Sequence, residues 1–155
     1  MARAKTAQKL MTSAIGGIIG FFCVLGGFMQ SVFYVGLGGF VGSILRYGLG
    51  KVPVAITFPI MTIVINLTGS FVIGFVSEFA KDRTDISPGV VVSLQAGFCG
   101  GFTTFSTFSL ETVAMIQDSK YLAASTYVFL SVLLCLVGTI FGMLVARTVK
   151  SKCAI

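Results

Sequence analysis

The stretch GFCGGFTTFSTFSLET, residues 97–112, differs from the apolar sequence on either side of it. It holds three glycines, four phenylalanines and five Ser or Thr hydroxyls ahead of Glu111. The Gly100 and Gly101 pair favours a break in a helix, because glycine has little helical preference. Backbone groups freed by a break inside a membrane must be satisfied by side chains, water, a partner chain or an ion. The stretch therefore predicts an ion site in a broken transmembrane helix.

The rest of the chain has the composition of an integral membrane protein. Of its 155 residues, 55% are hydrophobic and only 10% are charged, and it contains no His or Trp. Each of its apolar runs is near the ~20 residues that cross a hydrocarbon core, and they lie at 10–29, 31–50, 59–79, 88–116 and 121–146. Continuous runs favour helices over a β-barrel. We expect an all-α protein of the cell membrane with four transmembrane helices, the third of them broken, with or without an extra N-terminal helix.

Several classes of function are disfavoured. The four cysteines lack CxxC spacing and the chain has no His, which argues against a zinc site. The Lys and Arg residues lie at the ends of apolar runs, where they anchor lipid headgroups, so nucleic acid is not an expected partner. No nucleophile, base and orienting group occur together, so an enzyme is not expected.

We divide the chain into an N-terminal extension (1–30), a four-helix transmembrane domain (31–148) and a short basic tail (149–155). The extension is either an extra apolar helix or sequence ahead of a native start at Met29, and a signal peptide would lack its cleavage site. Without the extension, Lys and Arg divide three to five between the two sides of the membrane. If residues 10–29 span, the division is six to five; if they do not span and lie on the side where the run 31–50 begins, it is eight to three. A chain with so little bias would insert both ways and pair head to foot.

Two of the apolar runs carry polar stripes. Asn66 lies on one helical face with Thr62 and Ser70, and its carboxamide is too costly to expose to lipid without hydrogen bonds. It either ties helices together or offers uncharged N–H donors to an anion. The last run has the four-residue series Tyr127, Ser131 and Cys135. The two stripes could line one path.

The run 31–50 contains a pair of glycines and an arginine, and the opening stretch contains a glutamate, each with a structural and a functional interpretation. Gly38 and Gly42 lie four residues apart, a spacing that lets two membrane helices approach closely. Arg46 either extends to the interface or gives a vestibule positive potential for anions. Glu111 is either an exposed residue at a helix end or a charge at a pore mouth.

The broken helix could serve ions of either sign. Freed carbonyls are oxygen ligands for a cation such as Na+, whereas freed amides and helix N-termini attract anions. Phe105 and Phe108 share one face, and the positive edges of their rings can approach an anion. They are interleaved with the hydroxyls of Thr103, Thr104, Ser106 and Thr107.

On these residues the chain resembles the Fluc (CrcB) family of small fluoride channels. The matching stretches are GGFVGSILRYGLG (38–50), FPIMTIVINLTGSFVIGF (58–75) and GFCGGFTTFSTFSLET (97–112). The resemblance covers residues 31–148 and leaves out the first 28. It implies a dual-topology antiparallel homodimer, or a heterodimer with a paralogue, that has two fluoride pores and exports fluoride to relieve its toxicity.

The resemblance also implies roles for individual residues. Na+ at the dimer interface would be held by the backbone carbonyls of Gly100 and Thr103 from both subunits. The fluoride path would be lined by Asn66, Thr104, Phe105, Thr107, Phe108, Tyr127 and Ser131, with Arg46 and Glu111 at the vestibule. Cys135 stands where the family has a second serine, so that contact is weakened or shifted.

Two rival functions are weaker. A dual-topology multidrug exporter needs a carboxylate deep in the membrane, and all five acidic residues lie near the ends of apolar runs. A structural membrane subunit would explain the glycine spacing, but it leaves Asn66 and the hydroxyl-rich break unexplained.

Overall fold

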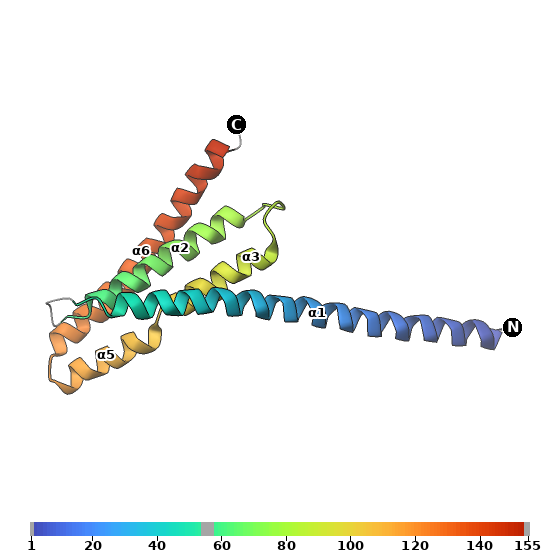
Figure 1. Cartoon of the computed structure of the whole chain (residues 1–155), viewed down its shortest axis with the longest axis horizontal. Coiled ribbons are helices and arrows are strands. Elements are labelled where there is room, and N and C mark those ends of the chain that lie inside the picture. The colour runs from blue at the N-terminus through green and yellow to red at the C-terminus, as the bar shows by residue number, and fades with distance from the viewer. Residues whose placement is uncertain (1, 54–57, 154–155) are drawn as a thin grey trace. The chain divides into compact units, whose positions relative to one another are not determined.

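A computed structural model describes the backbone of residues 2–53 and 58–153 and the side chains of residues 25–53 and 58–152. All regular elements in this part of the chain are helical, which confirms the expected fold class (Figure 1). In chain order they are α1 (Ala2–Gly50), α2 (Ile60–Ala80), α3 (Pro88–Val92), the π-helical η1 (Ser93–Cys99), α4 (Gly100–Phe102), α5 (Phe105–Gln117) and α6 (Tyr121–Cys153).

Helix α1 contains the first two apolar runs, and residues 29–31 at their junction are helical. No proline or charged residue lies between Lys9 and Arg46, and the Ser31 hydroxyl donates to the Gly27 carbonyl within the helix (2.9 Å). The chain forms two compact units, Met1–Phe33 and Tyr34–Ile155, and each is described by itself. Most side chains of the extension 1–30 lie outside the described residues, and whether it spans the membrane or precedes a native start stays a prediction.

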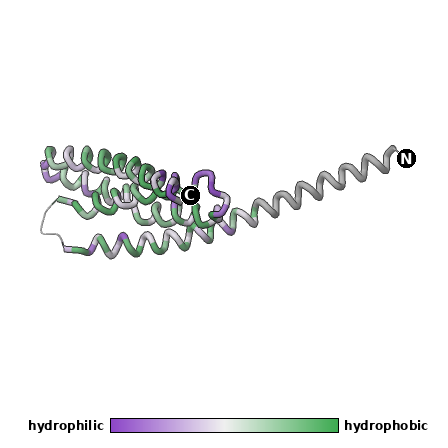
Figure 2. Tube along the Cα trace, turned by 90° about the horizontal axis from the view of Figure 1, so that it is seen from above, coloured by the Kyte–Doolittle hydropathy of each residue, from purple (hydrophilic) through white to green (hydrophobic). Residues whose placement is uncertain are grey.

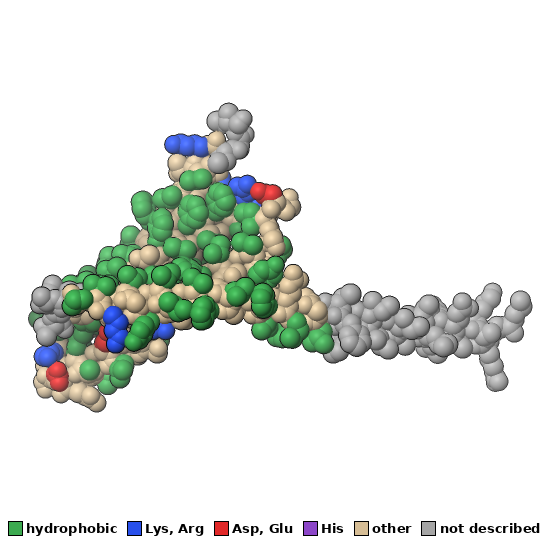
Figure 3. Space-filling model, viewed as in Figure 1, with side chains coloured by type: hydrophobic (Ala, Val, Ile, Leu, Met, Phe, Trp, Pro, Cys, Tyr) green, Lys and Arg blue, Asp and Glu red, His purple; other side chains and the backbone are tan. Residues whose placement is uncertain are grey.

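Three segments of the described residues are long and apolar enough to cross a membrane: Leu25–Gly50, Ile60–Ala80 and Tyr121–Lys152. The remaining expected span, 88–116, is divided into shorter pieces. Figure 2 shows hydrophobic colour along these helices and hydrophilic colour on the loop between α2 and α3. In the space-filling view apolar side chains are spread over the visible described surface, and charged side chains form a few small groups (Figure 3).

Glycines allow the helices of the second unit to pack closely. A Cβ at Gly38 would overlap the Ser93 carbonyl, and one at Gly42 would overlap the Phe98 carbonyl, so α1 lies directly against η1. Helices α2 and α6 meet in the same way, because a Cβ at Gly142 would overlap the Phe71 carbonyl. The prediction of close packing at Gly38 and Gly42 is therefore confirmed.

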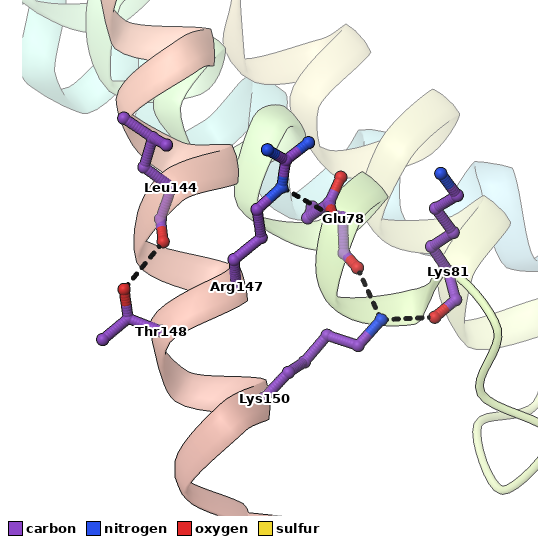
Figure 4. Close-up of polar contacts among 6 residues, drawn as sticks. All are labelled: Glu78, Lys81, Leu144, Arg147, Thr148 and Lys150. Carbon is purple, nitrogen blue, oxygen red and sulfur yellow. Dashed lines mark hydrogen bonds and ion pairs between the residues drawn. The ribbon is translucent and has the colours of Figure 1, made fainter.

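The ends of α2 and α6 are held together by charged side chains (Figure 4). The Lys150 ammonium donates to the carbonyls of Glu78 (3.2 Å) and Lys81 (2.6 Å) at the end of α2. Arg147 Nε donates to Glu78 Oε1 at 2.9 Å. Lys150 thus binds carbonyls that have no helical partner and carry the negative end of the helix dipole.

The helix break lies at Thr103 and Thr104, and the expected position at Gly100 and Gly101 is wrong. Gly100 is helical (φ −63°, ψ −39°), whereas Thr103 (−78°, 158°) and Thr104 (−145°, 109°) are extended. Gly101 serves packing instead, because a Cβ there would lie 2.6 Å from the Gly39 carbonyl oxygen of α1. Gly101 therefore permits a close contact between helices, and the two threonines adopt the extended backbone of the break.

Candidate functional site

The side chain of Asn66 is bound to the backbone at the break. The Thr104 amide donates to Asn66 Oδ1 at 2.7 Å, and Asn66 Nδ2 donates to the Thr104 carbonyl at 3.1 Å. Asn66 lies two turns inside α2, a helix long and apolar enough to cross a membrane, so this pairing satisfies extended backbone where water is scarce. One N–H of the carboxamide is used in this way, and the other remains as a donor. Both interpretations of Asn66, as a tie and as a donor, are therefore compatible with its position.

Thr104 caps the helix that follows the break. Its hydroxyl accepts a hydrogen bond from the Thr107 amide (3.1 Å) and donates to Thr107 Oγ1 (2.8 Å). Threonine is a favourable N-cap residue because its side chain replaces a missing helical acceptor. The Thr104 proton is committed to this cap, whereas the Thr107 hydroxyl accepts there and keeps its own proton for another partner. Of these two predicted path residues, Thr107 has the available donor.

The carbonyls of Gly100 and Thr103 lose their helical donors at the break. In an uninterrupted helix the amides of Thr104 and Thr107 would donate to them, but both amides donate to side-chain oxygens instead. Freed carbonyls are oxygen ligands of the kind that hard cations prefer. In the described residues no group of three or more His, Cys, Asp or Glu side chains could hold a metal. The two freed carbonyl oxygens therefore fit the chemistry of ligands for Na+.

Arg46 also contacts the break. Its Nε donates to the Gly101 carbonyl at 3.0 Å, and its side chain is half-buried. This carbonyl would otherwise accept from Phe105, which lies beyond the break. Arg46 lies near the C-terminal end of α1, and its guanidinium faces the broken helix and brings a positive charge to it.

A cavity of about 490 Å³ lies beside the break, between α2, η1 and α6. It is lined by four of the predicted path residues, Asn66, Phe105, Phe108 and Ser131, and by both residues of the predicted Na+ site, Gly100 and Thr103. The rings of Phe105 and Phe108 lie 5.4 Å apart, between centroids. The Ser131 hydroxyl is buried and has no hydrogen-bond partner among the described residues. This residue of the cavity wall thus carries an uncharged donor that no described protein group receives.

A second, more polar cavity lies on the other side of the break. It is lined by both predicted vestibule residues, Arg46 and Glu111, and by Thr104 and Thr107. The structure therefore divides the predicted residues between two neighbouring cavities, except Tyr127, which lines neither. Thr104 and Asn66, which line different cavities, are bonded to each other.

Glu111 is held by two hydroxyls, so it is not a freely exposed residue at a helix end. Thr62 donates to Oε1 at 2.9 Å and Tyr127 donates to Oε2 at 2.6 Å. Tyr127 is fully buried, and its ring lies 5.2 Å from that of Phe108. The two hydroxyls stabilise the carboxylate and connect α2, α5 and α6 at one point.

The sequence reasoning missed one polar pair and one partner. Gln95 of η1 lines the first cavity and donates to Ser77 of α2 at 2.9 Å. The lone amide in the apolar run SLQAGFC was an available signal. Thr62 was placed on the face of Asn66, but its bond to Glu111 joins residues 49 positions apart and has no local signal.

Comparison of the sequence with known proteins finds one matching family and several relatives of one name. The family described as CrcB-like protein, Camphor Resistance (CrcB), matches residues 33–143. A protein of Citrifermentans bemidjiense named fluoride-specific ion channel FluC is 38% identical over 142 residues, which cover 90% of this chain and 98% of the relative. Proteins of the same name are 48% identical over 90 residues in Geotalea daltonii, covering 58% of this chain and 73% of the relative, and 42% identical over 95 residues in Chlorobium chlorochromatii, covering 61% and 74%. The chain described here belongs to the CrcB family.

Proposed function

We propose that this chain is a fluoride channel of the cell membrane, which lets fluoride leave the cell and so relieves its toxicity. The observation that carries the proposal is the set of uncharged donors around the break, in a chain of the CrcB family. The second N–H of Asn66 and the unpartnered Ser131 hydroxyl belong to the first cavity, and the Thr107 hydroxyl belongs to the second.

Uncharged donors suit a small, strongly hydrated anion. Fluoride must lose part of its water to enter a narrow path, and hydroxyls, an amide and aromatic ring edges can replace that water. A ring of fixed positive charges would bind the anion too tightly for rapid release, since conduction needs weak and multiple sites. Arg46 is half-buried and bonded to a carbonyl at the polar cavity, so it attracts anions to that cavity, whereas the cavity that Asn66 and Ser131 line does not include Arg46.

Liposomes loaded with fluoride and chloride, and monitored with an electrode for each ion, test this function. Fast fluoride release with chloride retained is the expected result. Retention of both ions by liposomes that contain well-folded protein would refute the proposal. Phe108→Ala should slow fluoride release, whereas Phe129→Ala, on the exposed face of α6, should not.

We propose further that two copies assemble in antiparallel orientation. Phe105 lines the first cavity yet is 78% exposed in the single chain, so the cavity opens at the protein surface. Asn66 and Ser131 share that cavity, and lipid is a poor neighbour for such polar groups. A second copy would close it, and the near balance of Lys and Arg favours opposite orientations. Cysteine labelling from each side of intact vesicles should find every loop labelled from both sides; labelling from one side only would refute dual topology.

The same assembly would hold Na+ at the carbonyls of Gly100 and Thr103. A bound Na+ would supply a fixed positive charge that links the two broken helices. Both carbonyls have lost their helical donors, which supports this assignment. Replacing Na+ by N-methylglucamine should lower the unfolding temperature of the detergent-solubilised protein, and Na+ should restore it selectively over K+. Equal unfolding temperatures in all three salts would refute the Na+ site.

A further inference from the structure

The wall that α6 gives to the first cavity has an unsatisfied hydroxyl. Ser131 is 5% exposed and its Oγ has no partner among the described residues. Hydroxyls in membrane helices commonly donate to the carbonyl four residues earlier, as Thr139 of this helix does to Cys135 (3.0 Å). Leaving a buried hydroxyl unpaired costs about 1–3 kcal/mol. This turn of the cavity wall therefore holds a donor that the described protein groups do not satisfy.

Cys135 lies one helical turn beyond Ser131 and lines the same cavity. Its thiol is free and the residue is half-buried, so its sulfur can be reached from the cavity. A second cysteine, Cys99 of η1, also lines this cavity but is only 2% exposed. Any species that travels along α6 past Ser131 therefore passes Cys135, whereas Cys99 is withdrawn behind its neighbours.

The other polar groups of the cavity wall are hydroxyls and amides, which are hard ligands. Sulfur is soft and polarizable, and a thiolate selects soft cations such as Ag+, Cu+ and Hg2+. Binding replaces the thiol proton, which passes to water, by a bond from the sulfur to the metal, and no electron is transferred. A cation fixed at this point would obstruct the cavity and hold an anion too tightly for release.

We infer that Cys135 is a binding site for soft, thiophilic metal cations inside the ion path, and that its occupation stops conduction. This inference rests on the proposed function, because the consequence of binding is the loss of fluoride release. It makes the chain sensitive to a class of inhibitor that a hydroxyl at the same position would not bind.

The test uses the full chain with Cys23→Ser and Cys153→Ser, which retains only the two cavity cysteines. Mercuric nitrate in chloride-free buffer should slow fluoride release from liposomes by at least about tenfold, and dithiothreitol should restore it. For every variant the result is the ratio of rates without and with Hg2+. Adding Cys99→Ser should leave this ratio unchanged, whereas adding Cys135→Ser or Cys135→Ala should reduce it to less than about twofold. Equal inhibition of the Cys135 variants, or no inhibition of the parent, would overturn the inference.

A second measurement keeps the question decidable if a Cys135 variant fails to fold or conduct. Intact mass spectrometry with peptide mapping of the parent should find the mercury adduct on Cys135. An adduct on Cys99 alone, or none, would overturn the inference. If the parent releases no fluoride even without Hg2+, the proposed function fails, while the location of the adduct still decides whether Cys135 is the metal site.

Discussion

The carboxamide of Asn66 pairs with the backbone of Thr104 through two hydrogen bonds, one donated by each residue. A side chain of α2 thus replaces hydrogen bonds that the third transmembrane element loses where it breaks. The same pairing leaves the Gly100 carbonyl without its helical donor. One asparagine therefore stabilises the break and keeps a carbonyl available to an ion.

Replacing Asn66 should damage both stability and conduction. In Asn66→Ala the Thr104 amide and carbonyl lose their partners at a depth where water is scarce, which should lower the free energy of unfolding by about 1–3 kcal/mol. Asn66→Asp keeps an acceptor for the amide, but it sets a carboxylate oxygen against the Thr104 carbonyl and adds a negative charge to an anion path. Both variants should lose most fluoride release in the liposome assay. Thr68→Ala is the control, because the exposed Thr68 hydroxyl bonds only to its own helix; an unchanged rate in Asn66→Asp would contradict the site.

Two glycines of α1 should respond oppositely to alanine. A Cβ at Gly42 would overlap the Phe98 carbonyl, so Gly42→Ala must separate α1 from η1 and should destabilise the fold by about 1–3 kcal/mol. Gly48 has nothing within 4 Å of the position of an added Cβ. Gly48→Ala should therefore be neutral, or stabilising by up to about 1 kcal/mol. Unfolding in detergent measures the difference, and equal effects of the two changes would show that this crossing is not tight.

The contact between Tyr127 and Glu111 can be measured by a double-mutant cycle. Tyr127→Phe removes the hydroxyl that donates to the carboxylate at 2.6 Å, and Glu111→Gln removes the charge. A hydrogen bond to a charged group contributes about 1.5–3 kcal/mol, so the single changes should be clearly destabilising and the double change less than additive. Tyr121→Phe, on an exposed tyrosine of the same helix, is the control. Strict additivity would mean that the two side chains act independently.

Lys150 should stabilise the junction of α2 with α6. Lys150→Met keeps much of the side-chain length but removes the ammonium that binds the Glu78 and Lys81 carbonyls. The expected loss in the free energy of unfolding is about 0.3–1 kcal/mol, because a cation at a helix C-terminus has that effect. Lys152→Met removes the same charge two residues later and is the matched control. If both variants unfold alike, net charge and not these bonds explains the effect.

Local sequence patterns predicted the elements and much of the site. Hydrophobic runs located the helices, and four-residue spacing placed Asn66 and Ser131 on faces that line one cavity. The close approach at Gly38 and Gly42 followed from spacing alone, because small residues on one helical face have few other uses in lipid. These features depend on the spacing of residues close together in the chain, so they can be predicted from the sequence alone.

Features that depend on distant partners were not predictable. The break lies at Thr103 and Thr104 because Asn66 and Arg46 form hydrogen bonds with the backbone groups that the break leaves without helical partners. Arg46 is 55 residues from the Gly101 carbonyl to which it donates. A glycine pair signals flexibility, but it does not reveal whether packing will keep it helical. The π-helical η1 likewise has no marker in the sequence of Ser93–Cys99 that we can identify.

The break at Thr103 and Thr104 also has a consequence for synthesis at the ribosome. Residues 88–102 rise about 22 Å and the 13 residues of α5 about 20 Å, each less than the ~30 Å thickness of the hydrocarbon core. Neither half can complete a crossing alone, and the extended backbone between them needs partners from α1 and α2. Because those helices are earlier in the chain, the partners already exist when the broken element leaves the translocon. The order of the helices thus supplies the partners of the broken element before it is synthesised.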